Sequence, residues 1–142
     1  MVRDNIVPVE VFGVDHIALL LYVDEVTSAM GRLDRDCLRC NPRTHHMLMG
    51  EKQNAMSMDW KPEWGTKLGG YRWRKDPSLL LPDHDDWDCL MDLESAGLAE
   101  ILDLASGEAR LTLKGIKVAR EILRLKSLGV RPEDIPIKSI AL

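Results

Sequence analysis

Residues 83–128 constrain the fold of this chain more than any other part of the sequence. Their apolar residues first recur at three- and four-residue steps, then flank a Ser-Gly turn, and then return to helical steps. This order predicts a helix that ends at Gly97, a β-hairpin that bends at residues 105–108, and a last helix that starts at Thr112 or Lys114. A helix, a hairpin and a helix in this order define the carboxy-terminal half of the fold.

The ends of this segment carry further boundary signals. Asp83 or Asp85 is the expected cap of the first helix, because a short acidic side chain can accept a free backbone N–H there. Gly129 and Pro132 are expected to end the last helix. The tail, residues 129–142, contains three isoleucines that we expect to pack back on the body of the protein: Ile135, Ile137 and Ile140.

The amino-terminal half begins with a second helical pattern. Apolar residues recur at helical steps from Asp15, the expected cap, to a stop at Asn41-Pro42, with a possible interruption at Gly31. Residues 43–58 offer some apolar surface for a further helix, so residues 14–58 form the helical amino-terminal part. Residues 59–82 contain three prolines and three glycines, which favours a long loop.

The length of the chain favours one domain. At 142 residues a single core buries roughly two-thirds of the surface of the unfolded chain, so no disulfide or metal is needed for stability. We therefore expect residues 1–142 to form one mostly α-helical domain with a small β-hairpin, of the α+β class. Three cysteines cannot all pair, and we expect them to be reduced thiols.

Two stretches of the carboxy-terminal half resemble a known family. The string DWDCLMDLESAGLAE, a short hairpin and RLTLKGIKVAREI resemble the second half of bacterial winged-helix domains, in which L-x-x-L-x-x-x-G-L precedes the wing and L-T-x-x-G opens the next helix. The matching positions are Leu90, Leu93, Gly97, Leu98, Leu111, Thr112 and Gly115. The H-D-D-W element at residues 84–87 is similar to one in small proteins encoded by phages and prophages.

The resemblance covers about a third of the chain and implies a winged-helix-like part over residues 83–128. It says less about function, because this fold serves DNA binding, protein docking and dimerisation.

Charge is distributed unevenly along the chain. Between Asp76 and Glu108 there are ten acidic residues and no Lys or Arg, whereas residues 37–75 and 109–126 each carry five more basic than acidic residues. The formal net charge of −4 therefore hides three segments of alternating sign. Because a helix that reads duplex DNA uses Lys and Arg to contact phosphates, the acidic helix does not suit that role.

The acidic helix is the first candidate binding surface. Under the functional interpretation, four carboxylates would dock a basic partner: Asp85, Asp86, Asp88 and Asp92. Under the alternative, they form a solvated face near the positive end of the helix.

The loop at residues 59–82 is the second candidate, because aromatic rings alternate there with cations. The residues proposed to bind a partner are Trp60, Trp64, Trp73, Arg72 and Arg74. Such a mixture is typical of protein interfaces and of single-stranded nucleic-acid sites. The alternative is that the rings attach the loop to the core.

Cys37, Cys40 and His45 are the residues with metal-ligand spacing. A C-x2-C pair is a usual first half of a zinc site, but no second pair follows at the usual distance. We therefore expect no metal and no cofactor. The chain also lacks a phosphate-binding glycine loop, a G-x-S-x-G motif and H-E-x-x-H, and the adjacent Asp15 and His16 are more typical of a helix start than of an acid-base pair. We expect no enzyme.

The longest apolar run, Ile17–Val23, is too short to span a bilayer, and the amino terminus lacks the apolar stretch of a secretory signal. These patterns predict a cytoplasmic protein with no membrane contact.

Two hypotheses of function follow. The first is a small phage-type interaction protein, an adaptor or inhibitor that binds a protein partner. The second is a DNA-binding transcriptional regulator whose contacts come from Arg110, Lys114, Lys117 and Arg120. A homodimer is compatible with both, since the acidic segment could neutralise a basic segment of a second copy.

Overall fold

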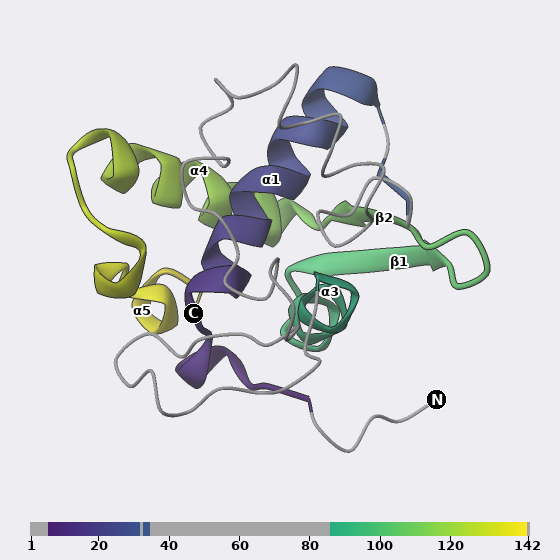
Figure 1. The fold of residues 1–142 in the computed structure, drawn as a ribbon, viewed down its shortest axis with the longest axis horizontal. Coiled ribbons are helices and arrows are strands. Elements are labelled where there is room, and N and C mark those ends of the chain that lie inside the picture. Colours follow the sequence, from purple (N-terminus) through teal and green to yellow (C-terminus); the bar gives the residue numbers. More distant parts are fainter. Residues whose placement is uncertain (1–5, 32, 35–85, 142) are drawn as a thin grey trace, which may run out of the picture.

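The computed structural model describes residues 6–31, 33–34 and 86–141 of the chain. This part is mostly helical and contains one two-stranded antiparallel sheet, which confirms the α+β class for the described residues (Figure 1). The predictions for residues 43–58 and 59–82 lie outside it. The elements are η1 (Val9–Val11), α1 (Val14–Met30), α3 (Asp86–Ser95), β1 (Ala99–Asp103), β2 (Glu108–Leu111), α4 (Leu113–Ser127), η5 (Pro132–Asp134) and α5 (Ile137–Ala141).

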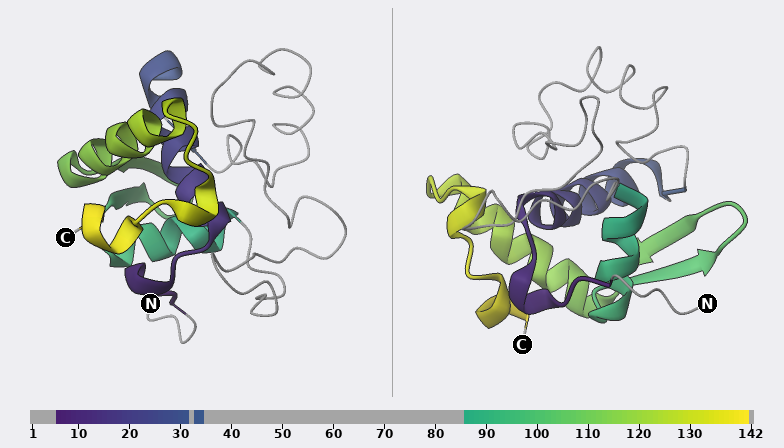
Figure 2. Two further views of the ribbon diagram at one scale, coloured as in Figure 1. Left: turned by 90° about the vertical axis from the view of Figure 1, so that its left-hand side faces the viewer. Right: turned by 60° about the horizontal axis from the view of Figure 1, so that its bottom comes forward.

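Helix α1 lies at the centre of the fold because it is apolar on nearly every side. Every residue from Phe12 to Val23 is buried. The helix contacts α3, β2, α4 and η5, and the two views of Figure 2 show these elements packed beside it. A helix with apolar residues on all faces belongs in the interior of a protein.

The start of α1 differs from the prediction. Gly13 is the N-cap residue, and Asp15 lies buried within the first turn. The free N–H of Gly13 is bonded by the Nδ1 atom of His16, three residues on, so a histidine takes the place that Glu or Gln holds in the usual capping box. The expectation that Asp15 caps this helix was wrong.

Helix α1 ends at the interruption that the sequence offered at Gly31. Gly31 has a φ of 81°, in the left-handed region that glycine adopts without a steric penalty, and it ends the helix. Two residues later, the carbonyl of Leu33 accepts a hydrogen bond of 2.9 Å from the N–H of Ala109 in β2. The predicted continuation of the helix beyond Gly31 is therefore wrong at Leu33.

The hairpin follows the predicted course. Strands β1 and β2 pair Ala99 with Leu111 and Ile101 with Ala109, and the chain turns between Asp103 and Glu108. Ala109 thus lies between Ile101 on one side and Leu33 on the other. Leu33, shortly after the end of α1, therefore adds an isolated β-bridge to the outer edge of β2.

The L-T-x-x-G stretch has a clear structural role. The hydroxyl of Thr112 donates to the carbonyl of Gly97 at 2.7 Å and accepts the N–H of Gly115 at 3.0 Å, so Thr112 caps α4 and joins it to the end of α3. A Cβ atom on Gly115 would lie 1.9 Å from the carbonyl oxygen of Leu98. Only glycine lets the two backbones approach so closely.

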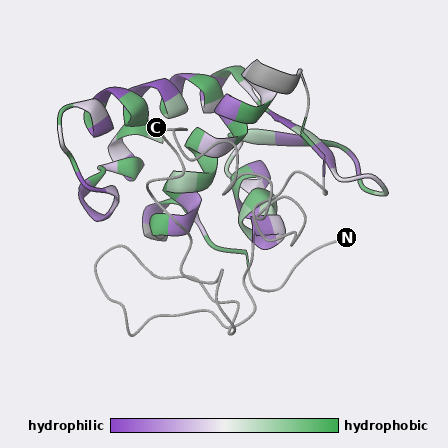
Figure 3. Ribbon diagram, turned by 45° about the horizontal axis from the view of Figure 1, so that its top comes forward, coloured by the Kyte–Doolittle hydropathy of each residue, from purple (hydrophilic) through white to green (hydrophobic). Residues whose placement is uncertain are grey.

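Helix α4 packs one face on the core and exposes the other. Val118, Ala119 and Ile122 are buried, and hydrophilic residues alternate with these hydrophobic ones along the helix (Figure 3). The chain then turns back as predicted, and Ile135 and Ile137 of the tail are fully buried. Helix α5 contacts both α4 and the amino-terminal η1, so the two ends of the described chain meet (Figure 1).

Candidate functional site

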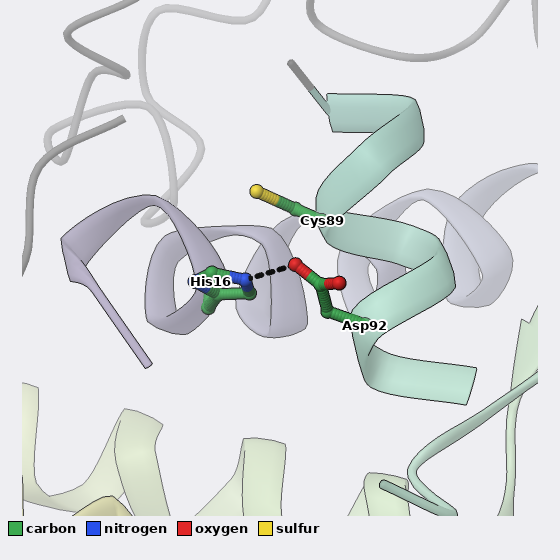
Figure 4. A group of neighbouring side chains, drawn as sticks. All are labelled: His16, Cys89 and Asp92. Atoms are coloured by element: carbon green, nitrogen blue, oxygen red, sulfur yellow. Dashed lines mark hydrogen bonds and ion pairs between the residues drawn. The ribbon is translucent and has the colours of Figure 1, made fainter. Parts of the chain in front are cut away.

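A cluster of three chemically active side chains lies where α1 meets α3. His16 comes from the first turn of α1, whereas Cys89 and Asp92 are three residues apart on one face of α3 (Figure 4). All three are buried, and one ligand atom from each lies within 4.8 Å of the other two. We call this group the buried cluster.

The hydrogen bonds of His16 define its protonation. Its Nδ1 accepts the N–H of Gly13 at 3.1 Å, so Nδ1 carries no proton. Its Nε2 lies 2.7 Å from Oδ2 of Asp92 and therefore donates to the carboxylate. The imidazole is thus neutral, and it stacks on the ring of Phe12 with the centroids 4.3 Å apart.

Asp92 connects three segments that are distant in sequence. Its Oδ1 accepts the backbone N–H of Val7 at 3.1 Å, while its Oδ2 accepts from His16. The carboxylate therefore joins α1 and the amino-terminal arm, residues 6–13, to α3. Both side chains have an exposed fraction of 0%, and a carboxylate without solvent needs such donors to remain in the interior.

The buried cluster has some of the chemistry of a metal centre. Thiolate, imidazole and carboxylate are ligands that zinc accepts. A metal on Nε2 of His16 would move the ring proton to Nδ1, where it would face the N–H of Gly13 instead of an acceptor. The donor set thus fits a metal, but the surroundings of the imidazole do not.

The same geometry argues against a nucleophilic triad. In a Cys-His-Asp triad the thiol faces one ring nitrogen and the carboxylate faces the other. Here Asp92 holds Nε2 and the Gly13 backbone holds Nδ1, and Cys89 has no solvent exposure. The buried cluster therefore acts as a structural anchor between α1, α3 and the amino-terminal arm.

The anchor was not predicted because its residues come from segments that are distant in sequence. In the sequence His16 lies beside Asp15, and this adjacent pair was interpreted as a helix start. Its actual partner, Asp92, is 76 residues away. Asp92 was instead expected to dock a partner. The sequence offered one signal, the three-residue spacing of Asp86, Cys89 and Asp92, and the structure shows that all three are buried on α3.

The acidic docking surface needs correction at two positions. Asp86 and Asp92 are both fully buried, so neither lies on an exposed face of α3. Asp88 is half-buried and Asp85 lies outside the described residues. The other candidates outside the described part are Trp60, Trp64, Arg72, Trp73, Arg74, Cys37, Cys40 and His45.

The hairpin exposes a surface that was not expected. Leu102 and Leu104 are 49% and 65% exposed, on either side of the exposed Asp103. We call these three residues the tip patch. Figure 2 shows the hairpin extending from the body of the protein.

The four candidate nucleic-acid contacts are all exposed, but two are engaged with acids. Arg110 pairs with Glu100 across the hairpin at 3.0 Å, and Arg120 pairs with Asp24 of α1 at 2.9 Å. The bond to Asp24 raises the pKa of Arg120 above its ordinary value. The two remaining cations are Lys114 and Lys117 at the start of α4.

Further along α4, Arg124 is also engaged. It donates to Glu121, which lowers the pKa of Glu121 and raises that of Arg124. Arg120 and Arg124 of this helix are therefore both paired with acids, and Lys126 adds a further cation to its last turn.

No protein-family model, curated protein or solved structure matches this chain. Among the described helices, none combines the length and the apolar character that crossing a membrane requires. The function must therefore be inferred from the geometry of the described residues.

Proposed function

We propose that this chain is a non-enzymatic protein-binding module, an adaptor or inhibitor of phage type, built on a winged-helix-like fold and docking through its hairpin. The fold assignment is supported by the order of the elements. Helix α1, a short extended residue at Leu33, α3, the hairpin and α4 follow one another, and Leu33 pairs with the outer side of β2.

One observation carries the functional proposal. In winged-helix proteins that read DNA, the helix before the wing enters the major groove. Here α3 and the hairpin as far as Ala109 contain no Lys or Arg, and the tip exposes two leucines around an aspartate. Apolar side chains beside a negative charge are better suited to bind a protein than DNA. The phosphates of DNA would repel the aspartate and provide no apolar contact for the leucines.

The alternative is a DNA-binding transcriptional regulator. Lys114 and Lys117 support it, because both are exposed and neither forms an ion pair within the described part of the chain. Two lysines provide few phosphate contacts, and salt dependence scales with the number of such contacts.

Binding to a fluorescent DNA duplex separates the two functions. We expect no duplex binding whose affinity falls steeply between about 50 and 200 mM salt. If such binding occurs and Lys114→Ala with Lys117→Ala abolishes it, the protein-binding proposal is overturned.

Protein binding is tested directly with immobilised protein. A host-lysate protein retained in stoichiometric amount should be lost with Leu102→Ser and Leu104→Ser. The control Leu128→Ser removes an equally exposed leucine at the far end of α4 and should leave retention unchanged. Equal retention by the tip variant would contradict docking through the hairpin.

A further inference from the structure

We propose that a second copy of this chain is a partner of the hairpin, and that the tip patch of one copy contacts the start of α4 in another. This inference rests on the proposed function only in that it uses the hairpin as a docking surface. Its second surface is the group Leu113, Lys114 and Lys117, which we call the α4 patch.

The α4 patch is apolar and positively charged. Leu113 is 70% exposed at the first position of the helix. Lys117 follows four residues later, so its side chain lies on the same face of the helix. Lys114 is exposed beside Leu113, and neither lysine forms an ion pair with another described residue.

The tip patch has the complementary character. Its two leucines offer apolar surface, and Asp103 and the nearby Glu108 are negative. If the two patches meet, the leucines of the tip patch can pack on Leu113, and its carboxylates can pair with the ammonium groups of Lys114 and Lys117. Two tip patches facing one another would instead bring like charges together.

The two patches of one molecule cannot meet. The hairpin base, where Ala99 pairs with Leu111, is next to the start of α4 at Leu113. The tip lies at the other end of β1, about 15 Å away for a strand of this length. Figure 2 shows the hairpin projecting away from α4, so only another molecule can supply the second patch.

A contact between two different patches is heterologous: in a pair, one copy keeps its α4 patch for a further contact and the other keeps its tip patch. Such contacts close into rings or extend into chains. Because the two patches are small compared with a standard interface of about 1,600 Å², we expect weak association that depends on concentration.

Sedimentation velocity of the full chain tests the inference. We expect the weight-average mass to rise above the monomer between about 10 μM and 1 mM protein, and to fall again as salt is raised. Leu104→Asp should remove the association, and so should Lys114→Glu combined with Lys117→Glu. All three side chains are exposed, so circular dichroism should show unchanged folding. Leu128→Asp, at the other end of α4, should associate like the wild type.

Mixing the two inactive variants gives the decisive result. The Leu104→Asp copy retains an intact α4 patch, and the lysine variant retains an intact tip patch. Their mixture should therefore form a one-to-one dimer and nothing larger. No dimer in the mixture would overturn the inference, as would a lysine variant that still associates, since that result indicates contact between two tips.

Failure here is distinguishable from failure of the proposed function. A wild type that stays monomeric to 1 mM overturns self-association, while loss of a lysate partner with the tip variant would still support docking through the hairpin. Salt-sensitive duplex binding would overturn protein docking by a separate measurement.

Discussion

Asp92 is a buried carboxylate that connects three segments of the described chain. Its carboxylate accepts from the backbone of Val7 and from His16, and both donors are buried. We expect Asp92→Ala to lower the free energy of unfolding by about 2–6 kcal/mol, because two buried donors lose their acceptor at about 1–3 kcal/mol each. Urea unfolding followed by circular dichroism measures this loss.

The matched control is Asp88→Ala, which removes a half-buried carboxylate one turn earlier on the same helix. It should cost less than about 1 kcal/mol. A similar loss for both variants would contradict the anchoring role of Asp92. His16→Gln offers a second check, since its amide can both accept from Gly13 and donate to Asp92, and it should be milder than His16→Phe.

Gly115 is constrained by space and not by its backbone angle. A methyl group there would meet the Leu98 carbonyl at 1.9 Å, so one of the two backbones would have to shift. We expect Gly115→Ala to cost about 3 kcal/mol or more, visible as a lower melting temperature. Gly31→Ala is the comparison, because it meets no atom within 4 Å and suffers only from its φ of 81°. It should cost about 1–2 kcal/mol.

Gly115 and Asp92 differ in how well their roles can be predicted from the sequence. Gly115 was identified through a motif, and its neighbours Leu111 and Thr112 are local enough for the motif to report their contacts. The link between His16 and Asp92 depends on how α1 packs against α3, and no spacing within either helix encodes it. Sequence patterns therefore predicted the local contacts and missed the buried cluster.

At the scale of elements, the cap of α4 is the joint between the hairpin and the last helix. The Thr112 hydroxyl bonds both the Gly97 carbonyl and the Gly115 N–H. Thr112→Ala should cost about 1–2 kcal/mol in denaturant unfolding, the usual loss for a helix cap. Thr112→Ser keeps the hydroxyl and should recover most of it. Equal destabilisation by both would show that the threonine methyl matters and the cap does not.

The predicted helices and strands were correct where the apolar spacing and a helix-breaking or turn residue indicated the same boundary. In residues 86–128 the helical steps, the Ser-Gly turn and the glycines all indicated the same boundaries, and the structure has them there. In α1 the steps continued past Gly31 through Leu33, so spacing favoured a longer helix. Leu33 is apolar because it pairs with β2 and is buried beside it, which spacing alone cannot distinguish from a helical position.

At the scale of the whole molecule, the two ends of the described chain help close the core. Val7 and Phe12 of the arm are buried, as are Ile135 and Ile137 of the tail, and η1 contacts α5. Segments from opposite ends of the sequence therefore stabilise one another only when the chain is folded. Loss of either end should weaken the whole domain, since a single core of this size unfolds cooperatively.

Ile135 tests this closure with one substitution. Its side chain has no exposure, whereas Leu128, seven residues earlier in the same carboxy-terminal region, is 67% exposed. Ile135→Ala leaves a cavity in the core and should cost about 2–5 kcal/mol, while Leu128→Ala should stay within about 0.5 kcal/mol of the wild type. Since a single core of this size unfolds cooperatively, tail and core signals should shift to the same denaturant concentration. If amide hydrogen exchange instead shows the tail opening alone, with α1 unaffected, the ends do not close the core.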